Sequence, residues 1–92
     1  MKFELGKVVM TSSIAELMKI NEDFANGVKL ALGKYVHCDW GITCEEDSAT
    51  NDEAVKNGDD RILAVYPTCK GNIWIITEWD RSVTTILFPS EY

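Results

Sequence analysis

The spacing of apolar positions changes along the chain, and each spacing predicts a different kind of element. Residues 3–10 contain a loose alternation of apolar and polar side chains, which predicts a strand, and Gly6 interrupts it as a bulge would. From residue 14 to residue 35 apolar side chains recur every three or four positions, which predicts one amphipathic helix. The stripe consists of Ile14, Leu17, Met18, Phe24, Ala25, Val28, Ala31, Leu32 and Tyr35.

Polar and small residues predict where the helices begin and end. Residues 13–16, Ser-Ile-Ala-Glu, fit a capping box at the start of the first helix, while Asn26-Gly27 favours a kink or a division and Gly33 an early end. Residues 43–46, Thr-Cys-Glu-Glu, form a second capping box and predict a helix over 44–57 that Asn57-Gly58 ends. This second helix has few apolar positions, so we expect it on the surface with its acidic side in water.

The last third of the chain has the composition and period of strands. The runs 61–66, 73–78 and 83–88 are rich in β-branched and aromatic residues, and short polar turns separate them. Turns this short predict a three-stranded antiparallel meander. The predicted fold is therefore a single α+β domain over residues 1–92, in the order β-α-α-β-β-β. A four-stranded, mainly antiparallel sheet would carry the helix 14–35 on one face.

The strand 73–78 indicates that both faces of this sheet are apolar. Ile73, Ile75 and Thr77 share one side, and Trp74, Ile76 and Glu78 share the other. One helix covers one face, so the second face is expected to bury against a partner or to form a homodimer.

The charge of the protein is concentrated in one segment. The net charge is −6, and residues 45–60 carry this whole excess while the rest of the chain is balanced. The acidic side chains of the segment are Glu45, Glu46, Asp47, Asp52, Glu53, Asp59 and Asp60, with Lys56 as the single base. Such a segment disfavours direct contact with nucleic acid and favours a partner protein with a basic surface. The alternative is a solubilising face with no partner.

Other chemistry finds little support in the sequence. His37, Cys38, Asp39 and Cys44 lie close together, but their spacing does not match a zinc site, and a Cys–His pair here lacks a third orienting group. There is no glycine-rich phosphate loop. The sequence therefore predicts no catalytic residues, no metal and no cofactor. Free thiols and the lack of a long apolar run or signal peptide favour a cytoplasmic protein without membrane contact.

Trp79 and Trp40 each allow either a binding role or a structural role. Trp79 and Arg81, beside the turn after the strand 73–78, are residue types that dominate protein-binding hot spots, although Arg81 could instead pair with Glu78 or Asp80 and fix the turn. Trp40, in the segment Asp39-Trp40-Gly41, is expected to cap the core rather than to bind a ligand.

The stretches WIITEWDRSVTTILFPSEY, DWG at 39–41 and NGDDRIL at 57–63 carry a resemblance to a family. The chain resembles small bacterial proteins of plasmids, conjugative elements and related mobile DNA, which go under the labels "plasmid-related protein" and "type I restriction endonuclease subunit M". The resemblance implies no activity and no catalytic residues. The second label also conflicts with the chemistry, because a methyltransferase needs a glycine loop and an (N/D)PP(Y/F) motif that the chain lacks.

The element order also resembles the small ribonuclease toxins of toxin–antitoxin pairs. Two functions follow as hypotheses. The preferred one is a non-enzymatic accessory protein of mobile DNA, regulatory or directed against host defence, that binds another protein through its acidic surface. The alternative is an atypical toxin-like ribonuclease that uses Arg61, Arg81 and His37.

Overall fold

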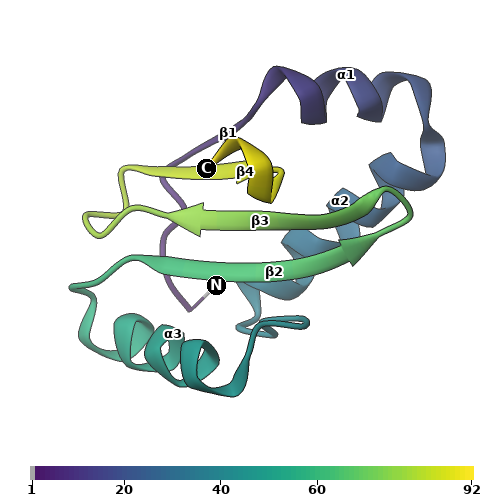
Figure 1. The fold of residues 1–92 in the computed structure, drawn as a ribbon. Coiled ribbons are helices and arrows are strands. Elements are labelled where there is room, and N and C mark those ends of the chain that lie inside the picture. Colours follow the sequence, from purple (N-terminus) through teal and green to yellow (C-terminus); the bar gives the residue numbers. More distant parts are fainter. Residues whose placement is uncertain (1) are drawn as a thin grey trace.

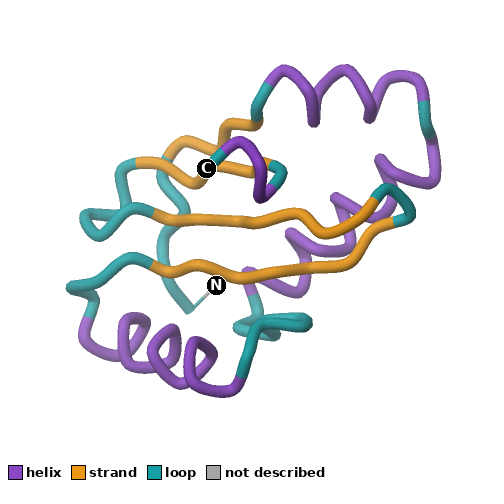
Figure 2. Tube along the Cα trace, in the orientation of Figure 1, coloured by secondary structure: helices purple, strands orange, loops and turns teal. Residues whose placement is uncertain are grey.

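A computed structural model of the protein describes residues 2–92 and contains a mixed sheet with helices on one face and at one edge (Figure 1). Figure 2 shows the same trace with helices and strands distinguished by colour. The elements in chain order are β1 (Lys7–Met10), α1 (Ser12–Ile20), α2 (Glu22–Val36), α3 (Glu45–Asn57), β2 (Ile62–Thr68), β3 (Gly71–Thr77), β4 (Val83–Leu87) and the 3-10 helix η1 (Pro89–Glu91). The α+β fold class predicted from the sequence is confirmed.

The sheet has the strand order β1-β4-β3-β2. The predicted antiparallel meander of β2, β3 and β4 is confirmed, with Ile75 opposite both Ala64 and Ile86. The first strand joins the sheet in parallel beside β4, so that Lys7 lies opposite Val83. It is shorter than predicted, because β1 covers four residues and not the whole of 3–10.

Gly6 explains why β1 begins at Lys7. Its φ of 63° lies in the left-handed region, and a Cβ atom at this position would stand 2.3 Å from the backbone oxygen of Arg81. Only glycine allows the chain to pass so close to the turn between β3 and β4.

The single long helix predicted over 14–35 is wrong, because the chain breaks at Asn21. Asn21 has an extended backbone, and its side chain accepts a hydrogen bond from the N–H of Phe24, which starts α2 as an N-cap does. The start of α1 also differs from the prediction, because the Thr11 side chain caps it instead of Ser13. Asn26-Gly27 and Gly33 lie inside α2 and neither kinks nor ends it at the predicted places.

The core lies between α2 and one face of the sheet, as predicted. Phe24, Val28, Ala31 and Tyr35 of α2 are buried against this face. The sheet contributes Ile62, Ala64, Tyr66, Ile73, Ile75 and Ile86.

A chain of hydroxyl groups crosses this core. The Tyr35 and Thr77 hydroxyls lie 2.7 Å apart, Thr77 lies 2.7 Å from Thr84, and Thr84 donates to the backbone oxygen of Leu5. Each polar group thereby has a partner, which offsets the cost of burying it. The network joins α2, β3, β4 and the segment before β1.

The second face of the sheet carries no helix in residues 2–92, apart from the short η1 in front of β4 (Figure 1). Tyr92, which follows η1, packs edge-on against Trp74 at a centroid distance of 5.3 Å and receives a hydrogen bond from Arg61. Ile76 and Leu87 are buried in this way, while Trp74 is half-buried. The described helices include none with the length and apolar content that a membrane crossing requires.

Candidate functional site

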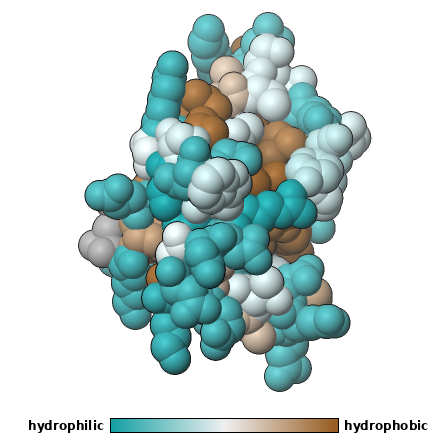
Figure 3. All heavy atoms as spheres, turned by 90° about the vertical axis from the view of Figure 1, so that its left-hand side faces the viewer, coloured by the Kyte–Doolittle hydropathy of each residue, from teal (hydrophilic) through white to brown (hydrophobic). Residues whose placement is uncertain are grey.

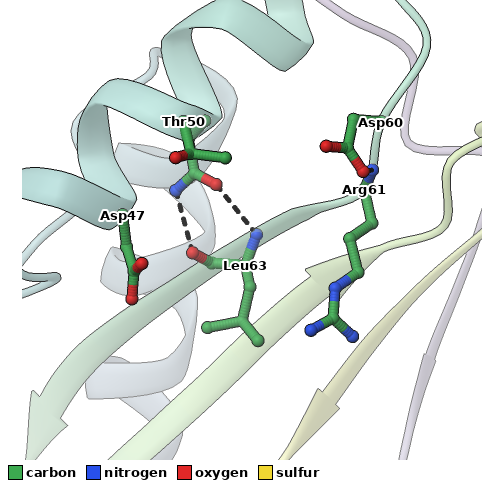
Figure 4. Close-up of a pocket in the computed structure, with 6 residues that line it drawn as sticks. Asp47, Thr50, Asp60, Arg61 and Leu63 are labelled. Atoms are coloured by element: carbon green, nitrogen blue, oxygen red, sulfur yellow. Dashed lines mark hydrogen bonds between the residues drawn. The ribbon is translucent and has the colours of Figure 1, made fainter.

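The acidic helix α3 lies beside β2, at the edge of the sheet, and one side chain attaches it there. The Asn51 side chain donates to the backbone oxygen of Leu63 at 2.8 Å and accepts from its N–H at 3.1 Å (Figure 4). An amide side chain thus pairs with β2 as a neighbouring strand would. Asn51 is 3% exposed, and its role is not evident from the sequence except as a polar residue on a helix with few apolar ones.

The loop before α3 covers the rest of the same edge. The Thr43 hydroxyl accepts from the N–H of Val65, and the backbone N–H of Ile42 donates to the Val65 oxygen. The capping box predicted from Thr43 is therefore wrong, because its hydroxyl is used by β2 and the N-cap residue is Cys44 without a side-chain hydrogen bond. Gly41 permits this approach, since a Cβ there would stand 2.5 Å from the Tyr66 ring.

Trp40 links the loop to both the core and α3. It is 6% exposed and packs edge-on against Tyr35, which confirms that it caps the core. Its indole N–H donates to a carboxylate oxygen of Asp52 at 2.8 Å. Asp52 therefore has a structural partner within the fold.

All seven carboxylates of residues 45–60 are exposed, but the structure does not bring all of them together. Four gather around one depression on the flank of α3, with a volume of about 430 Å³. We call this depression the acidic hollow and define it by Glu46, Glu53, Asp59 and Asp60. Helix periodicity places Glu46 and Glu53 on the same side, and the loop after Gly58 carries Asp59 and Asp60 back to them.

A smaller depression of about 150 Å³ adjoins the acidic hollow and shares Asp60 with it. Asp47 and Asp60 stand on its two sides, and Arg61 extends away from it across the sheet (Figure 4). The Arg61 guanidinium binds the Tyr92 hydroxyl and lies 5.7 Å from the centre of the Tyr92 ring. The hydrogen bond with Tyr92 raises the pKa of Arg61.

The predicted acidic surface therefore divides into parts. Asp52 lies toward Trp40 and Asp47 toward β2, while Glu45, at the start of α3, does not line the acidic hollow. The remaining four acids line the acidic hollow. Lys56 is the base on the same helix, at the three- and four-residue spacings from Glu53 and Asp52 that bring side chains together.

Arg81 joins the turn after β3 to the end of α3. Its guanidinium donates to the backbone oxygens of Ala54 at 2.9 Å and Asp60 at 2.6 Å, and also to those of Glu78 and Trp79. Arg81 thus fixes the turn as the structural alternative predicted, although through carbonyl groups and not through the Glu78 or Asp80 carboxylates. A cation at the carboxyl end of α3 also complements the helix dipole.

Trp79 is the exposed member of this turn, at 64% of its surface. Arg81 donates to backbone oxygens of Trp79, Ala54 and Asp60, which places the turn with Trp79 at the same end of the molecule as the acidic hollow. Figure 3 shows this end, where hydrophilic atoms predominate and hydrophobic atoms lie between them in separate patches. Hydrogen bonds from Ser82 lower the pKa of Asp80 in the same turn, so the local surface stays negative.

The remaining candidate residues lie apart. His37 ends α2 and lines a depression with Lys29 and Lys34, whereas Arg61 and Arg81 contact Tyr92 and the end of α3. Arg81 also donates to the backbone oxygen of Asp60, the residue before Arg61, while His37 lines a different depression. Cys38, Cys44 and Cys69 are free thiols. Within residues 2–92 no three His, Cys, Asp or Glu side chains are placed to hold a metal ion.

No protein-family model matches the chain, and the searches of curated proteins and of solved structures found no match either.

Proposed function

We propose that the protein acts by binding another protein, and that the contact is the acidic hollow together with Trp79. The observation that carries the proposal is that Glu46, Glu53, Asp59 and Asp60 line one depression at the end of the molecule that also carries the exposed Trp79. A rigid negative surface next to an aromatic anchor fits a basic groove on a partner.

The attachment of α3 supports the proposal. Asn51, Thr43 and Arg81 hold the helix and the following loop by hydrogen bonds to main-chain groups. The backbone that carries the carboxylates is thus fixed before binding, and it loses little conformational entropy when the protein binds. Solubility alone does not require that this backbone be held in place.

The class of partner follows from the charge. Basic grooves on proteins commonly accommodate the phosphates of nucleic acid, and a row of fixed carboxylates competes for the same groove. We infer a nucleic-acid-binding protein as the partner. The resemblance to proteins of mobile DNA is consistent with a host defence factor or a regulator in that role.

The test compares two variants of equal charge. The site variant E46Q/E53Q/D59N neutralises three acids of the hollow, and the control variant E4Q/E16Q/E22Q neutralises three exposed acids elsewhere. Each variant also removes one acid from the first turn of a helix, so their stabilities remain comparable. Asp60 is left unchanged because its carboxylate accepts from the N–H of Arg61.

Tagged wild-type and variant proteins are used to capture partners from an extract of the source organism. We expect a partner that the wild type and the control variant retain and the site variant loses, and that raised salt or a short DNA duplex releases. Retention by all three proteins, or loss from both variants, would contradict the acidic hollow as the contact.

A further inference from the structure

The free edge of β1 is the second feature of the molecule that lacks a partner within residues 2–92. The sheet ends in β2 on one side and β1 on the other. Asn51, Thr43 and Ile42 cover the main-chain groups of Leu63 and Val65 at the β2 edge. At the other edge β1 has β4 as its one neighbouring strand.

The register shows which main-chain groups of β1 point outward. The N–H groups of Lys7 and Thr11 donate to Ser82 and Ile86, each at 3.1 Å. Inward and outward groups alternate along a strand, so Val9 also faces β4. The N–H and C=O groups of Val8 and Met10 therefore face away from the sheet.

The side chains at this edge are apolar and incompletely covered. Val8 and Met10 lie beside Thr84 and Ile86, which are buried on the core side of the sheet. Yet Val8 is 41% exposed and Met10 is 39% exposed. The side chains of Val8 and Met10 are therefore left partly uncovered at the edge of the core, and a further strand beside β1 would cover them.

We propose that a second copy of this chain occupies the edge, with its β1 antiparallel to the first β1 around a two-fold axis at Val9. This register places Val8 opposite Met10 of the other copy, and every outward N–H and C=O of both strands finds a partner. Two other registers are excluded by the backbone. A two-fold axis at Val8 would pair Met10 with Gly6, which is not extended, and an axis at Met10 would pair Val8 with Ser12, which is helical.

The distribution of charge lets a second copy approach this edge without electrostatic repulsion. The excess negative charge lies on α3, beyond β2, at the opposite edge of the sheet. Joining two copies through β1 therefore keeps the two acidic helices at the far ends of one continuous sheet. At the junction, Lys7 would face Thr11 and not another lysine, so no like charges meet across the strands.

The covered β2 edge also limits the assembly to two copies. An isologous contact uses the β1 edge of both molecules, and the edges that remain are the two β2 strands. These already have Asn51 and the 42–43 loop as partners, so growth into a longer sheet stops. This dimer differs from the face-to-face dimer expected from the sequence and does not depend on the acidic hollow.

The test measures mass in solution by analytical ultracentrifugation up to ~1 mM protein, the concentration scale of a weak contact. We expect the wild type to approach twice the monomer mass as its concentration rises. In V8K/M10K, the lysine at position 8 of each copy faces the lysine at position 10 of the other copy. The two pairs of like charges repel each other, so this variant is expected to stay monomeric. In V8K/M10E each lysine faces a glutamate of the other copy, and dimerisation is expected to return. Thermal unfolding of both variants confirms that they are folded.

Three results would overturn the proposal. The wild type could remain monomeric throughout, in which case the edge is free or takes a strand of another protein. V8K/M10K could dimerise like the wild type, which would place the contact elsewhere. V8K/M10E could behave as V8K/M10K does, which would exclude the register. The dimer is held by main-chain hydrogen bonds and apolar contacts, so salt should affect it far less than it affects binding through the acidic hollow.

Discussion

The two edges of the sheet end in different ways. At β2 the backbone hydrogen-bonding groups of Leu63 and Val65 meet an asparagine side chain, a threonine hydroxyl and a short bridge from the 41–42 loop. At β1 the outward groups of Val8 and Met10 have no neighbouring strand in the described chain. The difference shows that this fold attaches the acidic helix by closing one edge, while the opposite edge has no neighbouring strand in the described chain.

The largest effect is expected at the closed edge. Asn51→Ala removes both hydrogen bonds to Leu63 and leaves two partly buried main-chain groups without their partner. We expect the free energy of unfolding to fall by about 2–4 kcal/mol. Urea denaturation measures it, and Asn26→Ala on the exposed side of α2 serves as the control, with a change within about 0.5 kcal/mol. An equal loss in both variants would mean that Asn51 does not hold α3 to the sheet.

The next effect is expected beside the open edge. Thr84→Val removes the hydrogen bond that holds Leu5 ahead of β1 and also the contact with Thr77. We expect a loss of about 1–3 kcal/mol and faster amide hydrogen exchange at Val9. Thr85→Val changes the neighbouring threonine on the other face, where it is half-buried, and should stay within about 0.5 kcal/mol. Unchanged exchange at Val9 would contradict the hydroxyl network as the support of β1.

A smaller effect is expected at the clamp between α3 and the turn. Arg81 has a φ of 61°, which glycine adopts without strain, so Arg81→Gly keeps the backbone conformation while it removes the whole side chain with its guanidinium. We expect a loss of about 1–2 kcal/mol and faster exchange at Gly58, the last N–H of α3. Arg81→Lys should not restore the protection, since an ammonium group cannot reach the same set of carbonyls. If Arg81→Lys kept the full protection of the Gly58 N–H, the positive charge alone would stabilise the end of α3, and the hydrogen bonds of the guanidinium would not be needed.

The smallest expected effect on stability comes from the buried tyrosines. It is absent near neutral pH and develops only in alkaline solution. Burial raises the pKa of Tyr35 and of Tyr66 above the value of 10.0 that applies in the unfolded chain. Above about pH 10 the unfolded state therefore releases protons that the folded state keeps, and stability falls as the pH rises. Thermal unfolding between pH 8 and 11 measures the fall, and Tyr66→Phe should flatten it. A melting temperature that stays constant over this range would contradict the pKa shift.

Much of the fold follows from local pattern. In β2, buried and half-buried side chains alternate from Ile62 to Tyr66, whereas the ends of β3 and β4 are buried on both faces, and short turns fix the antiparallel order of the three strands. The core stripe of α2 follows from its helical spacing. The break at Asn21 escapes this reasoning because the stripe of apolar residues continues through it, and only the side-chain cap on Phe24 distinguishes the two helices.

The parallel pairing of β1 with β4 could not be read from the sequence, because nothing local specifies a partner so distant in the chain. The site was predictable in part. The segment of excess charge identifies α3, and its exposure follows from its few apolar positions. The placement of α3 and of the loop after it depends on contacts made by Asn51, Trp40 and Arg81, and these residues have no periodic signal. Sequence patterns therefore located the negative charge but not the acidic hollow.

The hydrogen bond from Thr84 to Leu5 spans 79 positions, and the one from Thr11 to Glu91 spans 80. A ribosome releases the chain from its beginning, so the segment around Phe3, Leu5 and Val9 leaves the exit tunnel long before β4 exists to receive it. The meander and α2 can assemble around one another only after most of the chain is made, and β1 can join no earlier than β4. The first strand therefore leaves the tunnel ahead of its partner β4, and it is available to chaperones until β4 follows.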